Sequence, residues 1–181
     1  MELKQKIQEV LKIALKEKRE LELSVLRMLN AAITNKEKEK RYKIVNELRS
    51  FPPLAGARVS KEKPELTEEE LGKESCLTDE ETTEVIFTEV KKRKEALLLF
   101  EKGGRQDLAE KEKKEAAILQ EYLPEQLSEE EVKKIVKEAV GKVGAKEIKD
   151  MGKVMAELMP KVKGKADGSL VSKIIRELLV Q

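Results

Sequence analysis

The chain has 181 residues, of which 41% are charged and 39% hydrophobic, and its formal net charge is +2. This balance excludes a polycation and leaves too little apolar material for a thick core. Aromatic residues make up only 3%, so aliphatic side chains must fill the core that does form. Such a mixture is typical of amphipathic helices with salt-bridged outer faces, and it predicts an all-α protein.

The residue types also limit the chemistry. The chain has no histidine, which removes the usual general base and the commonest metal ligand. Cys76 is the only cysteine, so no disulfide can form within the chain. We therefore expect no catalytic residue, no metal site and no cofactor. The sequence contains neither a signal-peptide pattern nor the roughly 18 consecutive apolar residues of a membrane helix, so we expect a cytoplasmic protein without membrane contact.

Apolar residues at three- and four-residue spacing predict the first two helices. One helix covers residues 2 to about 17. The second carries an apolar stripe from Val25 to Ile33 and continues to Arg41. We expect these two segments to pack against the later helices of an N-terminal bundle.

Residues 50–77 differ from what precedes them. Pro52 and Pro53 cannot lie inside a helix, and the composition is that of a linker or surface loop. Within this stretch, Thr67 to Glu70 could cap a short helical turn. Residues 50–77 therefore represent a loop or an insertion.

A helical hairpin is predicted next. Thr78 to Glu81 has the spacing of a capping box, and Gly103 with Gly104 ends the helix that it opens. A second helix follows over residues 105–122. The first helix of this hairpin contains the basic block Lys91–Lys94. We interpret the block as a salt-bridged face opposite acids such as Glu17 or Glu37.

The best domain boundary lies around Pro124, which stops one helix before Ser128 to Glu131 caps another. Three short helices are predicted between residue 128 and the C-terminus. The expected organisation is an N-terminal helical domain of residues 1–124, built from helical hairpins, and a three-helix tail domain of residues 125–181.

The segment from Met151 to Ser172 is the least generic part of the chain. Its apolar residues lie on one face of a helix that Pro160 must end, and the next helix starts at Asp167, Gly168 and Ser169. The loop between them bends at Gly164 and contains three lysines. These are Lys161, Lys163 and Lys165.

Charge is spread unevenly along the chain. Residues 62–84 contain ten acids and two lysines, a net charge of −8, whereas residues 149–165 contain five lysines and two acids, a net charge of +3. A polyanion would have to bind a local patch. A helix N-terminus beside three lysines is a candidate phosphate site, and the alternative is the solvated tip of a helical hairpin.

Four motifs in the same order carry a resemblance to a known family. They are Phe100–Leu108 (FEKGGRQDL), Glu121–Ser128 (EYLPEQLS), Asp150–Met155 (DMGKVM) and Lys163–Gly168 (KGKADG). Together they resemble the YqeY-like proteins of bacteria, and the resemblance covers residues 1–43 and 78–181. That family shares its C-terminal part with the tail of the B subunit of tRNA-dependent amidotransferase, the GatB/YqeY domain, and the resemblance implies an all-helical N-terminal part followed by a three-helix tail.

In the amidotransferase the tail is understood to help hold the tRNA body. The resemblance therefore implies that five lysines contact RNA backbone, that Gly152 allows close packing, that Gly164 makes the turn, and that Asp167 caps the helix at Gly168. The five lysines are Lys149, Lys153, Lys161, Lys163 and Lys165. The chain resembles neither the kinase-like core of the B subunit nor the amidase subunit.

Three functions remain open at this point. The first is a noncatalytic accessory module that binds tRNA or another structured RNA. The second, implied by the family alone, is a carbon–nitrogen ligase with glutamine as amido-N-donor. The third is a helical scaffold for a protein partner. Clustered lysines favour the first function, because phosphate contacts explain them and a protein partner does not require them.

Overall fold

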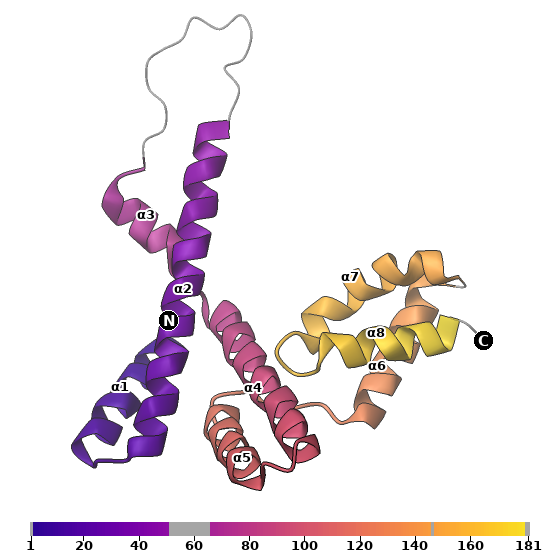
Figure 1. Cartoon of the computed structure of the whole chain (residues 1–181). Helices are drawn as coiled ribbons and strands as arrows, with labels where there is room; N and C mark the ends of the chain where they lie inside the picture. The colour runs from indigo at the N-terminus through magenta and orange to yellow at the C-terminus, as the bar shows by residue number, and fades with distance from the viewer. Residues whose placement is uncertain (1, 51–65, 146, 180–181) are drawn as a thin grey trace, which may run out of the picture.

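The computed structural model of the chain describes residues 2–50, 66–145 and 147–179. Within these residues the regular secondary structure is helical and no strand occurs, which confirms the all-α prediction. Figure 1 shows the arrangement. The helices are α1 (Glu2–Lys16), α2 (Glu20–Ser50), α3 (Glu68–Ser75), α4 (Asp79–Lys102), α5 (Gln106–Gln120), α6 (Glu129–Val143), the 3₁₀ turn η1 (Ile148–Asp150), α7 (Met151–Val162) and α8 (Gly168–Leu179).

The helix α2 is longer than the sequence pattern predicts, because it continues past Arg41 to Ser50. Its second half is supported from the side. The Nζ atom of Lys40 lies 2.8 Å from Glu81 of α4, and Arg41 pairs with Glu68 of α3. The apolar stripe also resumes beyond Arg41, where the half-buried residues are Ile44, Val45 and Leu48. The tertiary contacts and this stripe together continue the helix.

The helix α3 lies within the stretch 50–77 that the sequence suggests is a loop. Thr67 and Glu70 form the capping box at its start, and the helix then runs for eight residues. Leu71 is buried, which explains why the capped turn continues as a helix. The predicted loop at Pro52 and Pro53 lies outside the described residues.

The helices α4 and α5 form the predicted hairpin, and α4 lies between α2 and the C-terminal helices (Figure 1). The partners expected for its basic block are wrong. Glu17 pairs with Arg19 and Glu37 pairs with Lys4. The block instead uses acids of its own hairpin and of the loop before α8, while both expected acids are paired with other residues. These pairs are Lys92 with Glu89, Arg93 with Glu89 and Glu115, and Lys91 with Asp167.

The prediction that Pro160 ends its helix is wrong. The helix α7 continues to Val162 with Pro160 in its last turn. Proline removes one backbone donor, but the chain beyond it still bonds, since the Lys163 amide donates to the Met159 carbonyl at 3.0 Å. Val162 is 3% exposed, and its burial favours the additional turn.

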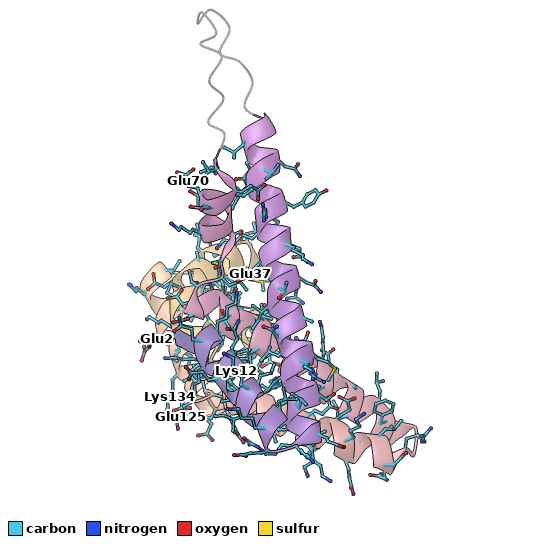
Figure 2. All side chains as sticks on the ribbon, turned by 90° about the vertical axis from the view of Figure 1, so that its left-hand side faces the viewer. Glu2, Lys12, Glu37, Glu70, Glu125 and Lys134 are labelled. Atoms are coloured by element: carbon cyan, nitrogen blue, oxygen red, sulfur yellow. The ribbon has the colours of Figure 1, made fainter. Side chains whose placement is uncertain are left out.

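The buried side chains form two separate hydrophobic clusters. One joins α1, α2, α4 and α5, and it includes Leu26, Ile86 and Leu119. The other joins α6, α7 and α8, called the tail bundle here, and it includes Leu158 and Ile175. Charged side chains such as Lys12, Glu70 and Lys134 lie on the outside (Figure 2). In the part of the chain that the structure describes, no helix is long and apolar enough to cross a membrane.

Candidate nucleic-acid interface

The loop between α7 and α8, residues 163–167, is held in one shape by its own backbone. Gly164 has φ of +71°, a conformation that glycine adopts without the steric cost of a side chain. The amides of Lys165 and Ala166 both donate to the Val162 carbonyl at 3.0 Å. This loop, called the lysine loop below, is therefore a tight turn closed onto the end of α7.

Asp167 lies directly before α8, and its Oδ1 atom accepts hydrogen bonds from the Ser169 amide at 2.8 Å and the Ser169 hydroxyl at 2.6 Å. Burial alone would raise the pKa of Asp167. The hydrogen bonds from Ser169 and Lys91 outweigh that effect and keep the pKa below its ordinary value. The first turn of α8 thus already has an ionised carboxylate beside its free amides.

The lysine loop also contacts the segment that leads into the tail bundle. The Leu127 amide donates to the Lys165 carbonyl at 2.8 Å, and the Gln126 side-chain amide donates to the Gly164 carbonyl at 3.0 Å. These bonds tie the loop to the connection after α5, so the loop and the start of α6 form one unit.

The five candidate lysines do not form a single cluster. Lys149 and Lys153 lie at the start of α7, whereas Lys161, Lys163 and Lys165 lie at its end. From Lys153 to Lys161 the helix advances by about 12 Å, at roughly 1.5 Å per residue. The structure therefore gives two cationic groups at opposite ends of one helix.

The lysines differ in their partners. Lys153 lies 2.9 Å from Asp150, and Lys149 lies 3.9 Å from Glu147. The Nζ atom of Lys163 lies 3.0 Å from Glu84 of α4. Exposed Lys161 and Lys165 take part in no ion pair within the described residues, and a polyanion could reach both of them without displacing a carboxylate.

The glycines of this segment have different roles. A side chain at Gly164 would place its Cβ atom 2.8 Å from the Cγ2 atom of Thr83, so only glycine fits this close approach to α4. Gly152 is exposed, and a Cβ atom there would have no neighbour within 4 Å. The close packing expected of Gly152 is therefore not found. Gly168, the first residue of α8, is equally open.

Sequence reasoning missed the residues of α4 that face the lysine loop. Besides Glu84 and Thr83, Lys91 donates from α4 to the Asp167 carboxylate at 3.1 Å and to the Ser169 hydroxyl at 3.2 Å. Thr83, Glu84, Phe87 and Lys91 recur at three- and four-residue spacing on one face of a helix, which is the signal that could have shown them. That spacing does not reveal which partner the face meets.

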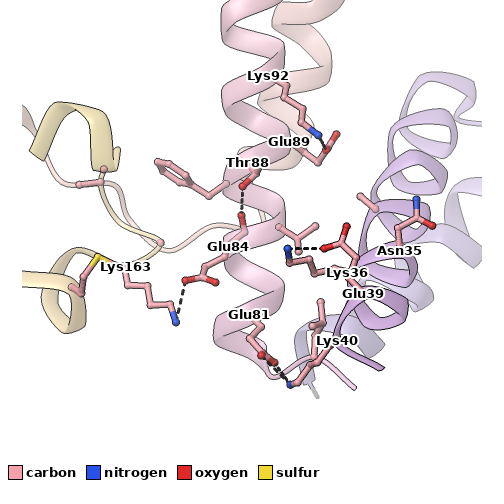
Figure 3. Close-up of a pocket in the computed structure, with 18 of the residues that line it drawn as sticks. Asn35, Lys36, Glu39, Lys40, Glu81, Glu84, Thr88, Glu89, Lys92 and Lys163 are labelled. Carbon is pink, nitrogen blue, oxygen red and sulfur yellow. Dashed lines mark hydrogen bonds and ion pairs between the residues drawn. The ribbon is translucent and has the colours of Figure 1, made fainter. Parts of the chain in front are cut away.

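A groove with a volume of about 930 Å³ lies between α2, α4 and the tail bundle. Its lining combines Met28, Phe87 and Met159 with ion pairs on the walls. Figure 3 shows Lys40 reaching Glu81, and Lys163 reaching Glu84 from the opposite side. Sequence analysis did not foresee the groove, since it forms only when three distant segments meet.

The Glu84 carboxylate is the acid nearest to Lys163 in the structure. The hydrogen bond that Lys163 donates to Glu84 raises the pKa of that lysine, and Glu80 and Glu81 act in the same direction. In the residues that the structure describes, no group of three or more histidine, cysteine, aspartate or glutamate side chains could hold a metal ion. The arrangement is thus an electrostatic surface of lysines, part of which is neutralised by α4.

These features define an all-helical protein with two hydrophobic clusters and a lysine-bearing C-terminal bundle. Its sequence matches the family described as Yqey-like protein over residues 57–179. The chain belongs to this Yqey-like family, in agreement with the resemblance that its motifs carry.

One curated relative is the E subunit of the glutamyl-tRNA(Gln) amidotransferase of Thermococcus gammatolerans. The two sequences are 37% identical over 106 residues, which cover 55% of this chain and 16% of that protein. The chain is therefore related to a part of an amidotransferase subunit, and it spans about one sixth of that protein's length.

Proposed function

We propose that this chain is a noncatalytic accessory module that binds tRNA or another structured RNA. The observation that carries the proposal is the pair of exposed lysines, Lys161 and Lys165, on either side of the loop turn, neither of which forms an ion pair within the described residues. The related amidotransferase is named for its action on glutamyl-tRNA(Gln), which supports an RNA as the polyanion.

The lysines suit contacts to the phosphate backbone. An ammonium group is a point charge that binds phosphate without reading a base, so such contacts position a folded RNA and carry little sequence information. At the other end of α7, Lys149 pairs with the exposed Glu147 and Lys153 with the half-buried Asp150. Both lysines are themselves exposed, so these pairs contribute little and phosphate can replace them. Two contact points at the ends of one helix would orient the RNA along α7.

The noncatalytic part of the proposal follows from what is shared with the relative. The related region covers 16% of the amidotransferase protein, so the activity of that whole protein is no basis for assigning the same activity to this chain. A carbon–nitrogen ligase with glutamine as donor is therefore the weaker alternative. Incubation of the purified protein with glutamine and charged tRNA should yield no amidated product, and formation of that product would overturn this part of the proposal.

The binding test is a titration of fluorescently labelled bulk tRNA at several salt concentrations. We compare the wild-type protein with the variant K161A/K163A/K165A. Each phosphate contact contributes roughly 0.9 to the slope of log affinity against log salt on duplex nucleic acid, so the variant should have a slope shallower by roughly two to three. Its affinity should fall most at low salt.

The matched control is K102A/K113A/K114A, which removes the same charge from exposed positions on α4 and α5. It should bind tRNA nearly as the wild type does. An equal loss of tRNA affinity in both variants would show that only the overall charge of the protein determines binding. Absence of binding by the wild type, even at low salt, would exclude the RNA role and would direct the search to protein partners.

A further inference from the structure

The lysine loop is docked on α4 by three different contacts. The Lys163 ammonium lies 3.0 Å from Glu84, Lys91 binds both Asp167 and Ser169, and Gly164 fits closely against Thr83. Gly164 is buried although it lies in a loop. Figure 3 shows Lys163 extending from the tail bundle to Glu84. The loop that contains the candidate RNA contacts is thus also the contact between the tail bundle and α4.

Both roles depend on the same ammonium group. Glu84 places carboxylate oxygens at Lys163, in the position that phosphate oxygens would need. The first turns of α4 add Glu80 and Glu81, which also act on Lys163. An RNA backbone approaching the docked loop would therefore meet carboxylates beside the lysine, and like charges repel.

The contacts that dock the lysine loop on α4 form in this structure, but breaking them costs little free energy. The side chains of Lys163 and Glu84 are 36% and 45% exposed, and such solvent-exposed ion pairs add little to stability. The packing of Gly164 on Thr83 is specific in shape but small in area. A polyanion that gains several lysine contacts at once could replace these interactions.

We propose that Glu84 competes internally with RNA for Lys163, so that docking of the lysine loop on α4 and binding of RNA through Lys163 exclude each other. This inference rests on the proposed RNA-binding function. In the docked arrangement, Lys161 and Lys165 make the first contacts with RNA. Release of the loop then adds Lys163, and the tail bundle separates from α4.

The first test is the isosteric variant Glu84→Gln in the tRNA titration. Loss of the carboxylate should raise tRNA affinity by about threefold to tenfold at low salt, because Lys163 no longer has to leave Glu84 before it contacts phosphate, and the salt slope should stay close to that of the wild type because the same lysines contact phosphate in the complex. The additional change K163A should remove this gain. Glu95→Gln is the matched control, because it removes the same charge from an exposed position further along α4.

The second test locks the loop in place. A Cβ atom at position 164 would lie 3.7 Å from the Cβ atom of Thr83, a separation that a disulfide accepts. The variant T83C/G164C, with C76S to remove the native thiol, should therefore cross-link on oxidation. The oxidised protein should bind tRNA with the shallower salt slope of K163A, and reduction of the same sample should restore binding. The reduced form also shows whether the substitutions alone affect folding or affinity.

The two tests separate two kinds of failure. If the cross-linked and reduced forms bind tRNA equally, or if Glu84→Gln behaves like Glu95→Gln, the competition at Lys163 is excluded while RNA binding stands. If neither the wild type nor Glu84→Gln binds tRNA at low salt, the proposed function itself is excluded, and the competition with it.

Discussion

The two regions around the hydrophobic clusters differ in whether they bury charged side chains. In the N-terminal cluster region, Arg93 and Glu115 are buried between α4 and α5, with 7% and 5% of their surface exposed. In the tail bundle, the buried side chains are all apolar among the described residues. One region therefore fixes its helices partly with a buried, directional ion pair, whereas the core of the other consists of apolar packing.

The buried ion pair is part of a small network. The Arg93 Nε atom lies 3.2 Å from Glu115, and its Nη1 atom lies 3.0 Å from the carboxylate of Glu89. Burial alone would raise the pKa of Glu89, but hydrogen bonds from Lys92 and Arg93 outweigh it and lower that pKa. Buried polar groups of this kind demand one relative position of their helices, whereas aliphatic side chains tolerate small shifts. The buried ion pair therefore fixes the register of α4 and α5, on which the rest of the N-terminal helices pack.

The largest effect should come from opening a cavity in the tail bundle. Leu158 is fully buried between α6 and α8, and Leu158→Ala should cost about 3 to 4 kcal/mol. Hydrogen exchange should show faster exchange in α6, α7 and α8, with protection of α1, α2 and α4 retained. Leu119→Ala, at an equally buried position of the other cluster, is the matched control and should give the opposite pattern. Equal loss of protection in both regions would show that the two clusters unfold as one unit.

Breaking the buried ion pair should have a somewhat smaller effect. Arg93→Met removes the guanidinium and leaves the Glu115 carboxylate buried with only the Lys111 ammonium, 4.0 Å away. We expect a loss of about 3 kcal/mol in urea unfolding, because an uncompensated buried charge is costly. The double variant R93M/E115L should recover most of that loss. If the double variant is as unstable as the single one, the pair contributes through packing rather than charge.

The sequence predicts the helices well where local signals define them. Thr78 with Glu81, and Ser128 with Glu131, are capping boxes in the structure as predicted. Gly144 ends α6 in the left-handed conformation, whereas Gly141 lies inside the helix. Such signals act within one or two turns, so a single sequence contains them.

What the sequence did not reveal depends on distant partners. The extension of α2 to Ser50 relies on α3 and α4, and the turn of α7 beyond Pro160 relies on the burial of Val162. The contact between Glu84 and Lys163 joins residues far apart in the chain. In the sequence, each of these side chains is indistinguishable from an ordinary surface charge. The candidate lysines could be named from the sequence, but their separation into two groups and their partners could not.

A smaller effect should follow from removing one helix cap in each region. The Ser128 hydroxyl accepts from the Glu131 amide at the start of α6, and Ser128→Ala should cost about 1 kcal/mol. Thr78→Ala removes the same kind of bond at the start of α4. Hydrogen exchange should show faster opening of the first turn of the affected helix in each case. Loss of protection from hydrogen exchange through the whole of α6 in Ser128→Ala would indicate that the tail bundle depends on this cap for its folding.

The smallest effect concerns the titration of the two capping glutamates. The pKa of Glu81 is lowered first by the hydrogen bond from Lys40 and then by the Thr78 amide, and the pKa of Glu131 is lowered first by the Ser128 amide. Because each folded-state pKa lies below the unfolded one, each carboxylate stabilises the fold at neutral pH. That stabilisation is lost as the pH falls through the lowered pKa.

Glu131→Gln keeps an acceptor that does not titrate, so it should reduce the acid sensitivity of α6 and leave that of α4 unchanged. Thermal unfolding of this variant and of the control Glu130→Gln, at neutral pH and below the ordinary glutamate range, would check it; an identical pH response in both would exclude the capping carboxylate as the acid-sensitive group of α6.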